Sequence, residues 1–252
     1  MGEDQILEKN ASKDMRTFRR KHALAVRDSL QDEWSKANER VSVLSTLCRH
    51  AVDLEWIERN PVVDVPKLKG GEFQAWPDNK LLAYERYCER HGLNVARTIY
   101  ELAVNTGQRL GDCIAMKWSD FDGEYMAVVQ QKTGHKMQVY CPQRLQSYLS
   151  ELPRAGAHIL AKNLREPLTK STVQKAVGVV QEAIGVKGGE DRLVIHGWRY
   201  TAAKQLADAG NDTTAIAAVT GHQTLSMVKK YTKQADQRLA SMRAQKRREE
   251  SE

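Results

Sequence analysis

Apolar residues recur at helical spacing in the first part of the chain. Between residues 37 and 59, Val41 and Leu44 belong to a set that shares one face of a helix. The Asn-Pro pair that ends at Pro61 provides a stop, because proline has no backbone N–H to donate. An earlier helix is predicted over residues 15–30, so the pattern indicates a small helical unit.

The second part of the chain begins with helices, changes to strands and then returns to helices. Ser171 and Gln174 form a capping box at the start of one helix, and Gly185 follows that helix as a stop. Residues 124–131 (EYMAVVQQ) and 136–141 (KMQVYC) are rich in strand formers and are joined by the turn KTGH, which predicts a hairpin. The fold class is therefore mainly α with a small antiparallel sheet (α+β). The predicted helices cover residues 79–91, 95–104, a segment from Gly111 to about Trp118, 171–184, 197–208, 213–219 and a last segment from near Leu225 into the tail.

Three of the six prolines and two adjacent glycines cluster in the stretch NPVVDVPKLKGGEFQAWP. Because proline fixes φ and removes a helix donor, this stretch is predicted to be an interdomain linker. We expect a partial helical domain over residues 1–60, the linker over residues 61–78, and a second domain with a C-terminal helical tail over residues 79–252.

The chain of 252 residues carries 39 Lys and Arg against 32 Asp and Glu, a net charge of +7. The excess lies in the second part, because residues 1–70 hold 13 basic and 12 acidic side chains. A basic domain favours a polyanionic partner such as nucleic acid. No apolar run approaches the ~18 residues of a membrane span. The start, MGEDQILEKN, is acidic where a signal peptide is basic and then apolar, so we expect a cytosolic protein.

The four cysteines lie at least 25 residues apart, without a CxxC pair or a nearby histidine. This spacing does not match a zinc motif, so reduced thiols that lie mostly in the core are expected. Carboxylates and histidines also lack ligand spacing, so we expect neither a metal nor another cofactor. The cysteines are Cys48, Cys88, Cys113 and Cys141.

Six polar side chains stand at helix starts, turns and loops where chemistry is often placed. Each also has an ordinary structural interpretation: the arginines and histidines can cap helices or form local ion pairs, the lysine can increase solubility, and the tyrosine can pack. Taken singly, each residue is a weak indication. They are Arg109 in NTGQRLGD, Lys132 in QQKTGHK, His196 and Arg199 in IHGWR, His222 in TGHQ and Tyr231 in KKYT.

Together, the order and spacing of these residues resemble the catalytic domain of the tyrosine recombinases, the phage-integrase-like family. That family has an arginine in a TGxR-type turn, a hairpin lysine, an HxxR motif, a Gly-His pair and a tyrosine. Here His222 follows Arg199 by 23 positions and Tyr231 follows His222 by nine. Gly210 also stands where the family usually has a glycine. The resemblance covers residues 76–238, and NPVVDVP with the helix before it resembles the end of the family's core-binding domain.

The resemblance implies the fold of a tyrosine recombinase catalytic domain preceded by a shortened core-binding domain. It implies a site-specific DNA recombinase or integrase that needs neither metal nor ATP, in which Tyr231 attacks the DNA to give a 3′-phosphotyrosine. The implied partners are double-stranded DNA and further copies of the chain, a tetramer in the active complex. Residues 238–252 would dock on a neighbouring protomer, or form a frayed terminus. Such a protein is bacterial or phage-encoded and associated with DNA in the cytoplasm.

The resemblance also assigns roles to the other site residues. Arg109 and Arg199 clamp the non-bridging phosphate oxygens with paired, permanently charged donors. His196 accepts the proton of the attacking tyrosine, and His222 donates a hydrogen bond to the phosphate. Lys132 delivers a proton to the departing 5′ oxygen.

Two of these assignments have alternatives. Lys136, four positions after Lys132, can approach the same phosphate from the second strand, and Tyr200, next to the HxxR arginine, is a second candidate nucleophile. Gly197 and Trp198 depart from the Asp-Leu that commonly fills the family's HxxR motif. Trp198 is expected in the core rather than stacked on a base.

Only some 60 residues precede the predicted linker, whereas full-length phage integrases carry an arm-binding domain and a complete core-binding domain there. A trimmed chain and a naturally short remnant both fit. Two other functions therefore stand beside recombination. One is a catalytically weak integrase remnant that only binds DNA, and the other is a relative of type IB topoisomerases. The complete set of six residues and its spacing favour a recombinase.

Overall fold

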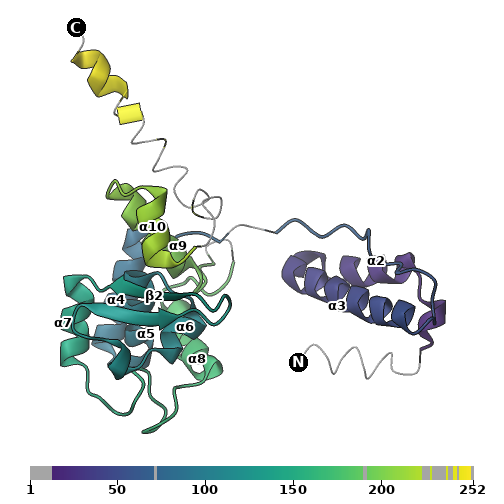
Figure 1. Cartoon of the computed structure of the whole chain (residues 1–252), viewed down its shortest axis with the longest axis horizontal. Helices are drawn as coiled ribbons and strands as arrows, with labels where there is room; N and C mark the ends of the chain where they lie inside the picture. Colours follow the sequence, from purple (N-terminus) through teal and green to yellow (C-terminus); the bar gives the residue numbers. More distant parts are fainter. Residues whose placement is uncertain are drawn as a thin grey trace. The chain divides into compact units, whose positions relative to one another are not determined.

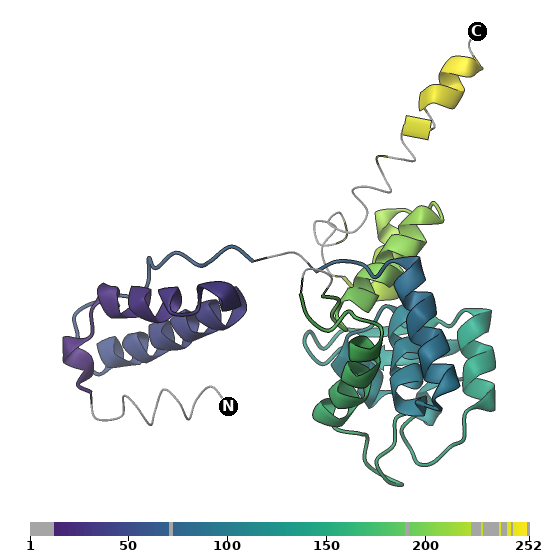
Figure 2. The same ribbon diagram turned by 180° about the vertical axis from the view of Figure 1, so that it is seen from behind.

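The computed structural model describes residues 13–70, 73–189 and 192–222, together with residues 228, 237, 241–242 and 244–250. The chain divides into two compact units, Met1–Glu72 and Phe73–Glu252 (Figures 1 and 2). Within the described ranges, no helix is both long enough and apolar enough to cross a membrane.

The first unit is built on two packed helices, α2 (Arg20–Asp28) and α3 (Trp34–Asp53). After α3 the chain returns along the helix pair, and the Asn60 side-chain amide donates to the Ser45 carbonyl at 2.8 Å. Residues from the start of the expected linker therefore belong to the core of this unit. The buried residues that pack together there are Ala23, Val41, Leu44, Cys48, Val62 and Val65.

Both helices of this unit differ in length from the prediction. The chain forms a short 3-10 turn, η1 (Met15–Thr17), before α2 begins at Arg20. The helix expected over residues 37–59 begins earlier and ends at Asp53, so its predicted end was wrong. The physical reason is Glu55, whose φ of 58° lies in the left-handed region and cannot continue a right-handed helix. The helix therefore stops before the Asn-Pro pair is reached.

The second unit is organised around α5 (Asn94–Thr106). Nine of its 13 residues are buried, and it packs against five other helices, which makes it the central helix of the unit. The surrounding helices are α4 (Asp78–Arg90), α6 (Leu110–Ala115), α7 (Gln143–Glu151), α8 (Lys170–Ala183) and α9 (Gly197–Asp208), and α10 (Thr213–Thr220) packs on α9 (Figure 1).

The predicted hairpin is present as β1 (Tyr125–Val129) and β2 (Lys136–Tyr140). The strands are antiparallel, and Val129 lies opposite Lys136, so the turn between them holds residues 130–135. One face of the hairpin carries the buried residues Met126, Val128 and Val139 into the core. The mainly α fold with a small antiparallel sheet is confirmed.

An aromatic cluster fills the core beneath α9. The Trp198 ring lies 5.4 Å from that of Trp76, 5.3 Å from that of Tyr84 and 5.4 Å from that of Tyr100, measured between ring centroids. Trp198 has no exposed surface, so its predicted place in the core is confirmed. All four cysteines are also buried and unpaired, as expected.

Two features near α7 and α8 were not predicted correctly. Helix α7 was missed, because its buried side is made by only Leu145 and Leu149. Helix α8 is capped by Thr169, whose hydroxyl accepts from the Thr172 N–H at 3.1 Å, rather than by a capping box at Ser171. A threonine oxygen two residues earlier thus satisfies one of the first N–H groups. The helix expected from near Leu225 begins outside the described residues; within it, residues 244–249 are helical.

Candidate active site

Arg109 lies in the turn between α5 and α6. Gly107 ends α5 at a φ of 64°, a conformation that favours glycine, and a Cβ there would stand 3.0 Å from a methyl group of Thr220. Arg109 Nη1 donates to Gln130 Oε1 at 3.1 Å and lies 3.7 Å from Asp112 Oδ2. Because its side chain remains 25% exposed, the guanidinium is held on one side and open to solvent on the other.

Arg199 lies in the first turn of α9 and is only 2% exposed. Its Nη1 donates to the Gly107 carbonyl at 2.7 Å, across 92 positions of the chain. Desolvating a guanidinium is costly, so a buried arginine of this kind requires compensating interactions. The turn that presents Arg109 therefore also holds Arg199.

The two candidate histidines stand at the ends of α9 and α10. His196 precedes α9, and its ring lies 4.9 Å from that of Phe73 and 5.6 Å from that of Tyr200. His222 follows Gly221, which ends α10 at a φ of 70°.

Burial lowers the pKa of both histidines, and the nearby charges of Arg199 and Arg109 lower it further. For His196 the charge of Lys132 acts in the same direction. For His222 the pKa falls to about 3, with His196 also contributing. Both imidazoles are therefore neutral near pH 7, the form that can accept a proton.

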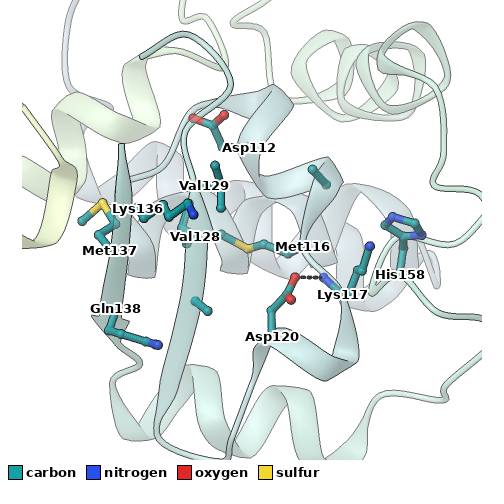
Figure 3. A pocket seen from close by; sticks show the side chains of 12 residues that line it. Asp112, Met116, Lys117, Asp120, Val128, Val129, Lys136, Met137, Gln138 and His158 are labelled. Atoms are coloured by element: carbon teal, nitrogen blue, oxygen red, sulfur yellow. Dashed lines mark hydrogen bonds between the residues drawn. The ribbon is translucent and has the colours of Figure 1, made fainter. Parts of the chain in front are cut away.

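The two hairpin lysines line different hollows. Lys132 lines a cavity of about 700 Å³ together with Arg109, His196 and Arg199. Lys136 instead lines a second hollow of about 720 Å³, between the hairpin and the segment that follows α6 (Figure 3). The structure thus brings Lys132, and not Lys136, into one cavity with the two arginines.

The cavity that contains Lys132 is strongly basic. Among the residues that the structure describes, six cationic side chains line it, against the single carboxylate of Asp112. Part of the wall is one side of α8, which contributes Lys170, Gln174 and Gln181. Such a concentration of positive charge suits a polyanion and, within it, a phosphate group. The six cationic residues are Arg109, Lys132, Lys170, Lys187, Arg192 and Arg199.

Tyr231 and Tyr200 are the two candidate nucleophiles. Tyr231 lies outside the described residues. Tyr200 is partly buried, and its ring contacts Phe73 at 5.9 Å between centroids as well as His196. Tyr200 therefore contributes to an aromatic contact beside the cavity.

Three polar residues that matter to the site were not among the sequence candidates. Gln108 and Gln130 are 1% and 0% exposed, and the side chain of Gln130 connects to that of Arg109. Asp112 is 3% exposed, and its Oδ1 accepts from the Gln131 N–H at 2.9 Å. Gln108 lies within the motif TGQR, and Gln130 lies near the end of the predicted strand, two positions before Lys132. Their closeness to these motifs was the one signal in the sequence that could have identified them.

No group of three or more metal-ligating side chains occurs among the residues that the structure describes. The site is instead built from arginine, lysine and histidine. Its chemistry is that of binding an anion and moving protons.

Comparison with known proteins identifies similar sequences and folds. The family model described as the phage integrase family matches residues 80–238. The integrase of Escherichia phage lambda is 31% identical over 144 residues, which cover 54% of this chain and 40% of that protein. A tyrosine recombinase XerC of Pediococcus pentosaceus is 22% identical over 213 residues, covering 77% of this chain and 70% of that protein. The chain thus spans less than half the length of the phage integrase that it matches.

Solved structures of lambda integrase have a similar fold. One is a dimer of residues 75–356 bound to a COC′ core site, with a TM-score of 0.72 and 25% identity over 87% of this chain and 81% of that one. Another is a tetramer bound to a Holliday junction, with a TM-score of 0.72 and 26% identity over 85% of this chain and 64% of that one.

Proposed function

Because this chain belongs to the phage integrase family, we propose that it is a site-specific DNA recombinase that cleaves and rejoins duplex DNA through a 3′-phosphotyrosine. The observation that carries the proposal is the convergence of Arg109, Arg199, His196 and Lys132 on one basic cavity. These residues come from a turn, a hairpin and the start of a helix, and a merely solubilising set of charges would have no reason to converge.

The two arginines supply the electrostatic part of the reaction. In the transition state, negative charge develops on the non-bridging oxygens of the phosphate. Guanidinium groups donate paired hydrogen bonds to such oxygens and keep their charge at any physiological pH. Arg109 is held by a hydrogen bond to the Gln130 side chain, and Arg199 by one to the Gly107 carbonyl. The two guanidinium groups are therefore in place before DNA binds.

The proton transfers follow from the remaining residues. The Tyr231 hydroxyl attacks phosphorus and its proton passes to neutral His196, while the bond from phosphorus to the 5′ oxygen breaks. Lys132 gives a proton to that oxygen, so a free 5′ hydroxyl leaves. Religation reverses each transfer, and the phosphotyrosine bond retains the energy of the original phosphodiester. The step requires no ATP.

The partner of the basic cavity is double-stranded DNA, and self-assembly on DNA, as a tetramer in the complete reaction, is part of the same proposal. The lambda integrase dimer on a core site and tetramer on a Holliday junction support it by similarity of fold. A protein of this function works where bacterial or phage DNA lies, so we propose the cytoplasm as its location.

A nicked suicide duplex tests the function, because cleavage near the nick releases a short strand and traps the covalent adduct. The natural chain should form a protein–DNA adduct that survives denaturation and excess EDTA. Tyr231→Phe should form none and bind DNA nearly as well, since phosphate contacts come from basic groups. Tyr200→Phe is the matched control and should retain the adduct.

Four results would count against this proposal. An adduct formed by Tyr231→Phe would assign the attack to another residue. Adduct formation that stops on chelation would indicate a metal-dependent reaction. DNA binding without any adduct would favour the remnant that only binds DNA. Relaxation of supercoiled plasmid without exchange between two sites would favour the topoisomerase-like activity.

A further inference from the structure

Gln130 closes the hairpin turn that carries Lys132. Its backbone N–H donates to the His135 carbonyl at 2.9 Å, and its carbonyl accepts from Thr133 N at 3.2 Å and Gly134 N at 2.8 Å. Both ends of the short loop around Lys132 are thus tied to one residue. The position of Lys132 depends on where Gln130 is held.

The Gln130 side chain, which has no exposed surface, is held on both of its polar atoms. Oε1 accepts from Arg109 Nη1 at 3.1 Å and from the Thr133 hydroxyl at 3.2 Å. Nε2 donates to Gln108 Oε1 at 2.8 Å and to the Thr220 carbonyl at 3.0 Å. A primary amide has two acceptor and two donor positions, so its hydrogen-bonding capacity is filled within the protein.

Gln108 extends this arrangement to the end of α10. Its Nε2 donates to the Val219 carbonyl at 2.8 Å and to the Thr106 carbonyl at 3.0 Å. Two side-chain amides therefore join the end of α5, the hairpin and the end of α10. His222 lies just beyond the α10 carbonyls that the amides hold.

The close approach of Gln130 also explains a glycine in the Gly-His motif. A Cβ at Gly221 would stand 2.3 Å from Gln130 Nε2 and 2.8 Å from Met137 Sδ, closer than real atoms approach. The φ of 70° at Gly221 favours glycine as well. The contact between the hairpin and the end of α10 is thus tight enough to restrict both segments.

We propose that Gln130 is a positioning residue. Held in turn by Gln108, it fixes the position of Lys132 relative to Arg109 and to the end of α10 that precedes His222. Buried polar groups whose partners are all present hold one arrangement, because any other leaves a donor or acceptor unpaired. Glutamate cannot make the two donations of Nε2, and methionine can make none of the four bonds. The inference rests on the proposed function, because it concerns the residue that delivers the proton to the 5′ oxygen.

The test compares two suicide duplexes, one with the normal 5′ oxygen and one with sulfur at that bridging position. A thiolate leaves without a proton, so the sulfur duplex bypasses the acid. Gln130→Met should slow adduct formation on the oxygen duplex about tenfold or more, the effect of losing buried hydrogen bonds. It should slow the sulfur duplex much less, so the ratio of sulfur to oxygen rates rises at least about fivefold over the natural chain.

Gln138→Met is the matched control, because Gln138 is an exposed glutamine of the same hairpin outside the amide network. Its two rates should equal those of the natural chain. Lys132→Ala removes the acid completely, so its ratio of sulfur to oxygen rates gives the upper limit for the rise expected in the other variants. Thr133→Val removes the hydroxyl that donates to Gln130 at 3.2 Å and accepts from the His135 N–H at 3.4 Å. Because Thr133 is exposed, the variant keeps the fold and should raise the ratio in the same direction. If Gln130→Met does not fold, the ratio measured for Thr133→Val tests the inference in its place.

An unchanged ratio in Gln130→Met, or in Thr133→Val if only that variant folds, would overturn the inference. A Lys132→Ala variant that gains nothing from sulfur would also overturn it, because Gln130 would then have no acid to position. The failure of the proposed function is a different result: the natural chain would form no adduct on either duplex.

Discussion

Thr220 and His222 are joined by a hydrogen bond, with Thr220 Oγ1 2.6 Å from His222 Nδ1. The same hydroxyl donates to the Ile216 carbonyl at 2.7 Å. A hydroxyl has a single proton, so toward His222 it acts as the acceptor and Nδ1 carries the imidazole proton. Neutral His222 then has no proton on Nε2. It can donate to a phosphate through Nε2 only after it takes up a second proton.

Thr220→Val tests this relationship through the pH dependence of DNA affinity. Phosphate binding raises the pKa of His222, so the complex holds more protons than the separate partners and the affinity increases as the pH falls. Without the Thr220 oxygen, neutral His222 can adopt the other tautomer and donate from Nε2. The affinity of Thr220→Val should therefore change less between pH 8 and pH 6, measured by titration with a fluorescent duplex.

The control for that measurement is Thr214→Val, an exposed threonine of the same helix, which should keep the pH dependence of the natural chain. Equal pH dependence in Thr220→Val and Thr214→Val would show that Thr220 does not select the tautomer.

The depressed histidine pKa values predict how folding stability responds to acid. The pKa of His222 is about 3 in the folded chain, and burial and the nearby arginines also lower that of His196. An unfolded histidine titrates near its ordinary value of about 6.5. Between these values the unfolded state binds more protons, so this part of the stability is complete above the unfolded value and decreases as the pH falls toward 3.

His222→Asn should therefore lose less of its free energy of unfolding between pH 7 and pH 5 than the natural chain does. Urea denaturation at both pH values measures the difference. A loss as large as that of the natural chain would show that His222 is not buried among positive charges in solution.

A buried carboxylate supports the central helix of the second unit. Glu101 in α5 is 1% exposed, and its carboxylate accepts from Arg144 Nε at 3.0 Å and pairs with Arg97 Nη2 at 2.7 Å. Removing one partner of a buried ion pair leaves charge uncompensated, so Glu101→Ala should lower the free energy of unfolding by about 3–5 kcal/mol. Glu89→Ala is the control: Glu89 also pairs with Arg97, at 3.0 Å, but is 64% exposed. Its loss should cost less than ~1 kcal/mol, and equal losses would contradict the prediction.

The wall of the basic cavity predicts a change in salt dependence. If Lys170 contacts a DNA phosphate, Lys170→Ala should reduce the slope of log affinity against log salt concentration by about 0.9, the value for one released counterion. Lys175→Ala, an exposed lysine of the same helix that does not line the cavity, should leave the slope unchanged. Affinities measured across a series of salt concentrations decide this, and equal slopes for the two variants would place DNA elsewhere.

Local pattern in the sequence was sufficient for much of the fold. Helix α9 covers Gly197–Asp208 as predicted. The hairpin followed from two segments rich in strand formers that are joined by a glycine-containing turn. The candidates Arg109, Lys132, His196 and Arg199 also followed from order along the chain, and they line one cavity. Each of these features is encoded within a few residues or in a motif spacing.

Only the tertiary structure decided how those residues are held. Gln130 meets Gln108 across 22 positions and the Thr220 carbonyl across 90, and Arg199 meets the Gly107 carbonyl across 92. The sequence shows a glutamine at such positions as an ordinary polar residue, since its partners are brought to it only when α5, the hairpin and α10 pack. Hydrogen bonds between distant segments depend on where packing places their atoms, whereas helices, strands and motif spacings are properties of adjacent residues.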